Sequence, residues 1–179
     1  MLEDDYRHLA EKLNGTFTVV HESHRMFGAS YPSSKYSFII PYKGVKITAE
    51  VQIGHENRGF LFCELDSQKV ASQFTITRPS LYRNFFWKKK KKKIGQNEFQ
   101  IASSNSTLIV FLRKDVNFYK LFKIADNTMF EPVIEGRNKE GKFVIDTVYP
   151  LMFAEKVQVL SLLIDLYKIL IDFFDSPES

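Results

Sequence analysis

The chain has 179 residues, of which 44% are hydrophobic, and it contains 17 Phe, 8 Tyr and one Cys. This length suits a single domain, and the apolar content excludes an intrinsically disordered chain. One cysteine excludes an intramolecular disulfide and a zinc site built from several cysteines. We therefore expect one domain over residues 1–179. The alternative is a two-lobed chain, with residues 1–87 and 94–179 joined by the basic segment 88–93.

The formal net charge of +4 comes from one segment of the chain. The stretch from Arg78 to Lys93 contains no acidic side chain and eight basic ones, namely Arg78, Arg83, Lys88, Lys89, Lys90, Lys91, Lys92 and Lys93. The other 163 residues hold 17 basic and 21 acidic side chains. Any attraction to an anionic partner is therefore expected in this segment and not in the rest of the chain.

The first predicted element is a short amphipathic helix. Leu2, Tyr6, Leu9 and Leu13 recur at helical spacing and form one apolar stripe on a charged segment. Asn14-Gly15 then supplies the left-handed residue at which helices commonly end. The sequence therefore predicts a helix that ends before residue 15.

The next part of the chain is predicted to form about five strands. Thr16–Glu22 is the first, and Arg25–Ser34 is expected to be a loop because it contains Gly, Pro and three serines. Val45–Ile53 alternates strictly between apolar and polar residues, and the turn before it joins it to Lys35–Ile40 in an antiparallel hairpin. Two further strands are predicted, Gly59–Leu65 and Val70–Thr77.

The second half of the chain is predicted to contain both strands and helices. A short strand at Glu98–Ala102 is followed by Ser103–Ser106, which offers good helix N-cap residues. Two short helices and a second hairpin follow, at Thr107–Lys114, Asn117–Ala125 and Phe130–Glu135 paired with Lys142–Val148.

The chain closes with a long predicted helix from Pro150 to about Phe174. Pro suits a first helical turn, and ~25 residues at ~1.5 Å rise would span roughly 37 Å. Its polar positions form one narrow stripe: Glu155, Gln158, Ser161, Asp165, Lys168, Asp172 and Asp175. Charges inside the run exclude a membrane span. We expect the helix to lie across a sheet with both flanks covered; alternatively, an apolar flank of the 150–174 helix binds a protein partner or a second copy.

Together these elements predict an α+β fold. We expect a largely antiparallel sheet of about six to eight strands in two meanders. A short N-terminal helix, two short middle helices and the long C-terminal helix complete the domain, with the long helix packed on the sheet.

The basic segment is the part of the sequence whose composition suggests a partner. Phe85, Phe86 and Trp87 directly precede the lysines, and aromatic rings beside lysines suit the headgroup region of an anionic membrane. Lysines that neutralise phosphates, with Trp87 stacked on a base, would suit nonspecific binding of nucleic acid. The third interpretation is a solvated, extended loop with no binding role, since six like charges repel one another.

Local motifs for catalysis or metal binding are absent from the sequence. His21 and His24 fall on opposite faces of a strand, and Cys63 lies in the apolar run Phe60–Cys63, where it is expected to be buried. No phosphate-binding glycine loop, nucleophile elbow or zincin motif occurs. We therefore expect no catalytic residue, no metal and no cofactor. The acidic start of the chain lacks the regions of a signal peptide, which predicts a cytoplasmic protein, with peripheral membrane association as a possibility.

The order of short motifs resembles a class of bacterial proteins of unknown function. The resemblance depends on the strand ending Phe74-Thr75-Ile76-Thr77-Arg78-Pro79, the basic insertion, the Ile94–Ile101 stretch and the long Leu-rich final helix. Members share a "gD-x-eFd" core, and some carry membrane-spanning helices beside it. This chain differs from the core pattern at Gln96-Asn97. The resemblance implies a bacterial protein and brings no functional residues.

The sequence thus favours a non-catalytic binding or scaffold module. Peripheral association with an anionic membrane through the aromatic and lysine-rich segment is the first alternative, and nonspecific nucleic-acid binding is the second.

Overall fold

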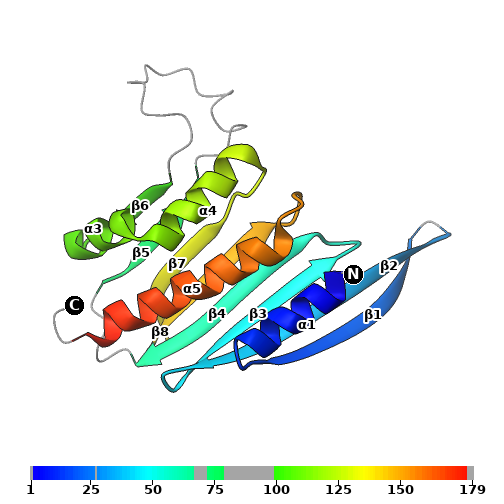
Figure 1. Ribbon diagram of the computed structural model, residues 1–179, viewed down its shortest axis with the longest axis horizontal. Coiled ribbons are helices and arrows are strands. Elements are labelled where there is room, and N and C mark those ends of the chain that lie inside the picture. Colours follow the sequence, from blue (N-terminus) through cyan, green and yellow to red (C-terminus); the bar gives the residue numbers. More distant parts are fainter. Residues whose placement is uncertain (1, 27, 67–71, 79–98, 177–179) are drawn as a thin grey trace, which may run out of the picture.

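Eight strands pair side by side in one antiparallel sheet, and the helices lie on one of its faces (Figure 1). The computed structural model describes residues 2–26, 28–66, 72–78 and 99–176. In chain order the described elements are α1 (Leu2–Lys12), β1 (Thr16–Met26), β2 (Ala29–Tyr42), β3 (Val45–Ile53), β4 (Arg58–Asp66), β5 (Phe74–Thr77), β6 (Gln100–Ser103), α3 (Ser106–Lys114), α4 (Val116–Asn127), β7 (Val133–Lys139), β8 (Lys142–Pro150) and α5 (Lys156–Asp175). The predicted α+β class, with its short first helix, two middle helices and long last helix, is confirmed.

The strand order is β1-β2-β3-β4-β8-β7-β5-β6. The first four of the five strands predicted in this part of the chain form a meander, whereas the fifth, β5, pairs with β6 and β7 instead of β4. β4 pairs with β8 along its whole length, from Arg58 opposite Pro150 to Asp66 opposite Lys142. Strands from both sides of the basic segment therefore share one sheet. The predicted alternation in β3 is confirmed, because Ile47, Ala49 and Val51 are buried while their polar neighbours keep partial exposure.

The predicted loop over Arg25–Ser34 is wrong, because this segment is strand. β1 runs to Met26 and β2 begins at Ala29, with Gly28 at a positive φ of 81° in the turn between them. Backbone pairing between the two strands replaces burial as the force that orders these polar residues. Pro32 is tolerated because β3 pairs with β2 only from Ser34 onward, so no strand on that side requires the missing N–H.

The predicted start of the last helix at Pro150 is also wrong. Pro150 is the last residue of β8, and the helix begins six residues later at Lys156. Pro150 pairs with Arg58 of β4, whereas β7 pairs with β8 only as far as Val148. As with Pro32, the ring stands where the sheet has no partner on one side, so a proline that suits a helix start can equally end a strand.

The helix α5 is the central support of the helical layer. Its buried residues are Val159, Leu160, Leu162, Leu163, Ile164, Leu166, Tyr167, Leu170, Ile171, Phe173 and Phe174. Its predicted polar stripe is the side that keeps exposure, as Gln158 and Asp165 illustrate. Figure 1 shows α1 on one flank of α5 and α4 on the other. The apolar flank that could have served as an interface is thus buried within the chain. Within the described residues, no helix combines the length and apolar character needed to cross a bilayer.

One buried hydroxyl connects α5 to the middle of the sheet. Tyr167 donates a hydrogen bond of 3.1 Å to the carbonyl oxygen of Leu61 on β4. Thr147 Oγ1 on β8 lies 2.9 Å from the same hydroxyl, and since the Tyr167 proton is already used, Thr147 is the donor. All three residues are essentially inaccessible to solvent. This arrangement fixes α5 over the β4–β8 pair and satisfies two buried polar groups at once.

Two glycines allow aromatic rings to lie flat against the strands. A Cβ on Gly59 would come 2.2 Å from the Tyr149 ring on the paired strand β8, and a Cβ on Gly136 would come 2.2 Å from the Phe74 ring on β5. Both contacts are far inside van der Waals separation. The glycines therefore create the space in which these large rings pack.

We predict opposite effects from removing two buried tyrosine hydroxyls. Tyr167→Phe should lower the free energy of unfolding by about 1–3 kcal/mol, because it leaves the Thr147 hydroxyl without its acceptor in a buried site. Tyr149→Phe should leave stability unchanged or raise it, because its buried hydroxyl has no hydrogen-bond partner among the described residues. Urea unfolding of both variants measures the difference. Equal destabilisation by the two substitutions would contradict the role assigned to Tyr167.

Candidate functional site

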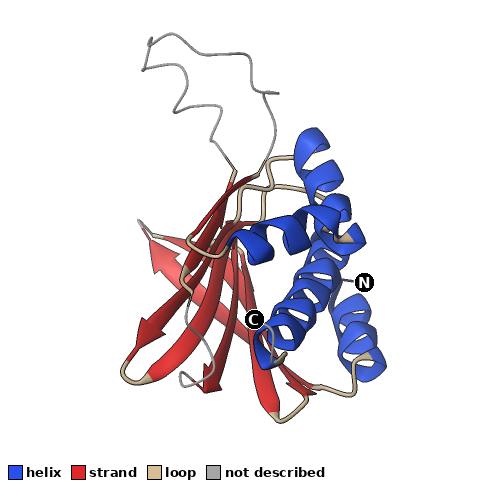
Figure 2. Cartoon of the chain, turned by 90° about the vertical axis from the view of Figure 1, so that its left-hand side faces the viewer, coloured by secondary structure: helices blue, strands red, loops and turns tan. Residues whose placement is uncertain are grey.

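The face of the sheet opposite the helices is open. Figure 2 shows the helices gathered on one side of the strands, and among the described residues no helix covers the other side. Side chains alternate between the two faces along each strand, so every second residue of β1 to β8 belongs to this open face.

Four apolar side chains lie next to one another on this face. Cross-strand pairing places Phe60 of β4 opposite Val148 of β8, and Val148 opposite Val133 of β7. Phe62 lies two residues along β4 from Phe60, on the same face. Phe62, Val133 and Val148 are 39%, 44% and 46% exposed, and the four side chains line a shallow hollow of about 390 Å³. We refer to Phe60, Phe62, Val133 and Val148 as the open-face patch.

A second valine on the same strand and face shows that this exposure is specific. Val144 also points to the open face of β8, but its cross-strand neighbours are Glu64 and Arg137. Val144 is only 3% exposed, in contrast to Val148. Long polar side chains can cover apolar neighbours with their methylene groups. Val148 instead has the apolar neighbours Phe60 and Val133 on either side, and it keeps 46% exposure.

The charged groups around the open-face patch are paired with one another. Arg137 contacts both Glu135 and Asp146. The Arg58 guanidinium lies 4.9 Å from the centre of the Phe60 ring and is paired with Glu56. Further out on the same face, the ammonium of Lys35 lies 2.9 Å from the Glu50 carboxylate, and Lys142 contacts Glu64. The rim of the open-face patch therefore carries no excess of positive charge.

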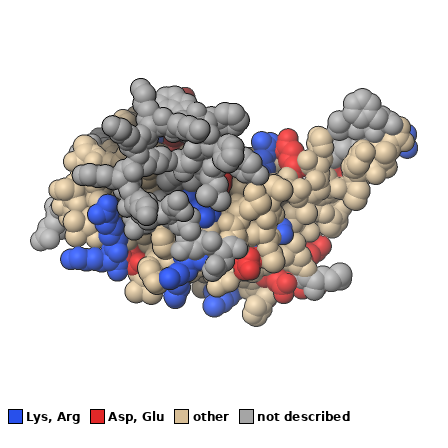
Figure 3. Space-filling view, turned by 90° about the horizontal axis from the view of Figure 1, so that it is seen from above, with Lys and Arg blue, Asp and Glu red and all other residues tan. Residues whose placement is uncertain are grey.

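Charges of both signs are also scattered over another side of the molecule. In Figure 3 basic and acidic groups appear among uncharged ones on the described surface. Isolated exposed charges of mixed sign produce little attraction for a polyanion. The described body of the protein thus matches the prediction that its basicity is not spread over the fold.

Of the residues predicted to contact anions, only Arg78 lies within the described part of the chain. Its Nη1 donates hydrogen bonds to the carbonyl oxygens of Thr128, at 3.0 Å, and Phe130, at 3.3 Å. These carbonyls follow the end of α4, so Arg78 has a structural partner at a helix C-terminus. The remaining predicted residues, Arg83, Phe85, Phe86, Trp87 and Lys88–Lys93, lie outside the described residues.

The titratable groups of the interior do not converge on a common point. Burial raises the pKa of the Cys63 thiol to about 12, as expected for a sulfur in an apolar run. Burial likewise raises the pKa of Tyr6 and Tyr149, which stay neutral. His21 on β1 contacts the Ser34 hydroxyl at 2.9 Å and lies 3.5 Å from Glu3. No group of three or more possible metal ligands occurs among the described residues.

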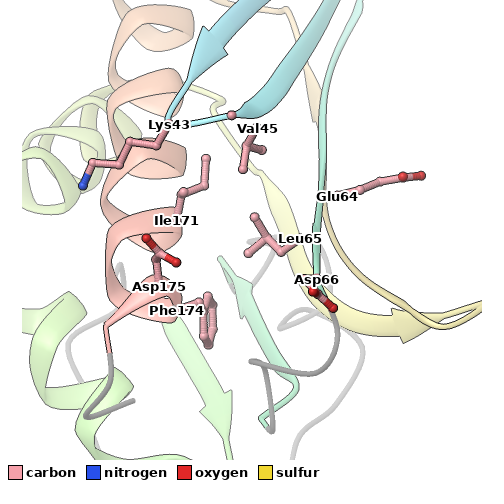
Figure 4. A pocket seen from close by; sticks show the side chains of 9 residues that line it. Lys43, Val45, Glu64, Leu65, Asp66, Ile171, Phe174 and Asp175 are labelled. Atoms are coloured by element: carbon pink, nitrogen blue, oxygen red, sulfur yellow. The ribbon is translucent and has the colours of Figure 1, made fainter.

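A second hollow, of about 310 Å³, lies where the end of α5 meets the turn between β2 and β3. Figure 4 shows Val45, Leu65 and Phe174 around its centre, while Lys43 and Glu64 point away from it. Lys43 instead reaches Asp172 at 2.6 Å, and the Tyr42 hydroxyl donates a 2.8 Å hydrogen bond to the same carboxylate. These bonds raise the pKa of both Tyr42 and Lys43. The polar groups beside this hollow therefore attach the β2–β3 hairpin to α5.

The open-face patch was not predicted from the sequence, although a signal for it was present. The apolar run Phe60-Leu61-Phe62-Cys63 predicts burial of Cys63, and no prediction was made for the two phenylalanines. In an antiparallel strand only alternate residues share a face, so Leu61 and Cys63 are buried and the two phenylalanines point to the other side. An unbroken apolar run on a strand that has helices on only one side was therefore the feature of the sequence that could have indicated exposed phenylalanines.

We predict that Cys63 is inert in the folded protein. A thiol with a raised pKa and no solvent access should not react with a disulfide reagent at pH 8, whereas unfolding in guanidinium should expose it at once. Because the chain has a single cysteine, absorbance of the released thiolate reports this site alone. Rapid reaction without denaturant would show that β4 is open to solvent.

Comparison with known proteins assigns no family to this geometry. No family model, no curated protein and no solved structure matches the chain. The resemblance to bacterial proteins of unknown function, which depends on the Phe74–Pro79 and Ile94–Ile101 stretches, therefore stays a prediction.

Proposed function

We propose that this chain is a non-catalytic binding module that contacts a protein partner through its open-face patch. The carrying observation is a contiguous group of Phe60, Phe62, Val133 and Val148 on an open sheet face, with three of the four at least 39% exposed. Contiguous exposed apolar groups on a soluble fold characteristically mark contact surfaces, and phenylalanine is enriched in the centres of such contacts.

The charge pattern around the open-face patch specifies the chemistry of the partner. Arg137 is held by Glu135 and Asp146, and Arg58 by Glu56, so the rim offers hydrogen-bonding groups but no excess of positive charge. A partner of matching chemistry presents an apolar centre and a polar rim without excess negative charge. A phosphate backbone or an anionic lipid surface would find no excess cation here to neutralise.

The interior of the protein supports a non-catalytic role. The buried hydroxyls of Tyr167 and Thr147 bond to each other and to the backbone, and the thiol of Cys63 is protonated at neutral pH. The hollow at the end of α5 is lined by four apolar and four charged side chains, and two of the charged ones are held in ion pairs, Lys43 by Asp172 and Glu64 by Lys142. A catalytic site would instead bring a nucleophile or base and a charge-stabilising group to one point in a cleft.

We predict that Val148→Lys abolishes partner binding without unfolding the protein. The substitution places a charge in the centre of the open-face patch, and Val148 is already 46% exposed, so stability should change by less than about 1 kcal/mol. Affinity capture with the full chain as bait, followed by direct binding measurement with the captured protein, should give at least a tenfold loss of affinity.

Val116→Lys is the matched control for this experiment. Val116 is 64% exposed at the start of α4, on the other side of the molecule, so the same substitution leaves the open-face patch intact. A partner that binds the wild type and Val116→Lys but not Val148→Lys supports the proposal. Equal binding by all three proteins, or equal loss in both variants, contradicts it.

The basic segment carries a second proposal, peripheral binding to an anionic membrane. Its support is the sequence, in which Phe85, Phe86 and Trp87 directly precede Lys88–Lys93 while the remainder of the chain has more acidic than basic groups.

We expect the full chain to co-sediment with phosphatidylserine vesicles at low salt and not with neutral phosphatidylcholine vesicles. Replacement of Lys88–Lys93 by glutamine should weaken this binding at least tenfold, since each lysine near the surface contributes about 1 kcal/mol. Val148→Lys should bind the vesicles like the wild type, which separates the two proposals. Vesicle binding that survives loss of the lysines, or preference for a single-stranded oligonucleotide over the vesicles, contradicts the membrane proposal.

A further inference from the structure

The strand β1 forms a long free edge of the sheet. It stands at one end of the strand order and pairs with β2 over all eleven of its residues, from Thr16 opposite Ile39 to Met26 opposite Ala29. No described strand pairs with its other side. The backbone groups on that side are a template to which a further strand can add.

The other free edges of the sheet are shorter than β1 or contain proline. The opposite end of the sheet is β6, which has only four residues. The part of β2 that extends beyond β3 contains Pro32, which has no N–H to donate. β1 contains no Pro, its register with β2 is unbroken by a bulge, and its charged residues Glu22 and Arg25 lie in its second half, so that its first five residues, Thr16 to Val20, carry no charge. Short edges, proline, lysine and bulges are the usual protection of an edge strand.

The helical layer is also incomplete at this edge. The helix α1 contacts β1 and β2, and Phe17 and Val19 on the helical side of β1 are only partly buried, as are Leu2 and Leu13 at the ends of α1. Arg7 of α1 covers part of Phe17, with its guanidinium 5.1 Å from the ring centre. Apolar side chains from both layers therefore reach the edge with part of their surface uncovered.

We propose that β1 pairs with β1 of a second copy of this chain, antiparallel and about a two-fold axis. A single peptide strand added to β1 would satisfy the backbone but leave the helical layer open. A second copy brings its own α1, so both layers continue across the axis and the uncovered parts of Phe17 and Val19 meet their counterparts.

The charges of α1 favour this arrangement. Two-fold symmetry places the two α1 helices side by side and antiparallel. The first turn of α1 carries Glu3, Asp4 and Asp5, and its last turn carries Lys12. The acidic start of each helix then faces the last turn of the other, where Lys12 stands beside Glu11, and the antiparallel helices oppose their macrodipoles favourably. The surface of α1 is thus complementary to its own copy in the proposed orientation.

The proposed pairing is independent of the open-face patch. Strand addition at β1 leaves β4, β7 and β8 untouched, and it puts the open faces of the two copies on the same side of one continuous sheet. The dimer would then present two open-face patches in a fixed relation.

Substitutions at two adjacent residues of β1 test the pairing, because successive side chains of a strand point to opposite faces of the sheet. Val19 lies on the helical side and is partly buried, whereas Val20 lies on the open face and is 50% exposed opposite Lys35. Sedimentation velocity of the full chain at micromolar concentration should show the wild type and Val20→Glu at twice the 20.9 kDa chain mass. Val19→Glu should weaken dimerisation at least tenfold, because it places two carboxylates at the seam beside the acidic turns of α1.

A second measurement covers the case in which Val19→Glu does not fold. Amide hydrogen exchange of the wild type should show protection over residues 16–26 that disappears on dilution, since one side of β1 gains partners only in the dimer. A wild type that stays monomeric at micromolar concentration overturns the inference. The inference is also overturned if Val148→Lys dissociates the dimer and Val19→Glu does not, because that result places the contact at the open-face patch. Neither outcome depends on whether a heterologous partner binds.

Discussion

The contact between α5 and the β4–β8 pair is the constraint from which the rest of the arrangement follows. One sheet and one layer of helices can bury only one face of each strand, so the helix that crosses the sheet determines which face that is. Here Tyr167 fixes the choice, because its hydroxyl bridges Leu61 and Thr147 in a site without solvent. If α5 shifted by one residue, the Tyr167 hydroxyl would lose both hydrogen bonds, and an apolar side chain in its place could not form them. The register of α5, and with it the identity of the open face, is thereby specified.

The parts of this fold that could be predicted are those in which burial and local pattern agree. In Val45–Ile53 the alternation of side chains matches the two faces of β3, and in α5 the polar stripe matches the exposed side. The errors arose where backbone pairing decides and burial does not. Arg25–Ser34 is polar and contains Pro32, yet it pairs as strand because β1 and β2 extend beyond their neighbours. Pro150 ends a strand instead of starting a helix, since a missing N–H is tolerated at either place.

The candidate site was hidden from the sequence for a related reason. An apolar run in a strand does not say which of its residues face the helices. The placement of α5 assigns Leu61 and Cys63 to the interior and Phe60 and Phe62 to the opposite face. Their neighbours across the sheet, Val133 and Val148, lie more than seventy residues further along the chain. No local window of sequence contains that juxtaposition. The basic segment, in contrast, is visible in the composition alone, because its signal is charge and not contact.

The same architecture therefore leaves two different surfaces available, the open face of the sheet and the free edge at β1. A sheet with helices on one side leaves its other face to solvent. On that face Val144, between Glu64 and Arg137, is 3% exposed, whereas Val148 is 46% exposed. The sheet also leaves edges, and β1 is the long one, with no Pro and with an uncharged first half. A second layer of helices would have removed the open face but not the edge, and closure of the sheet into a barrel would have removed the edge but not the open face. The sheet does neither, so both surfaces persist on a rigid support, and each can be blocked by a single charge without disturbing the other.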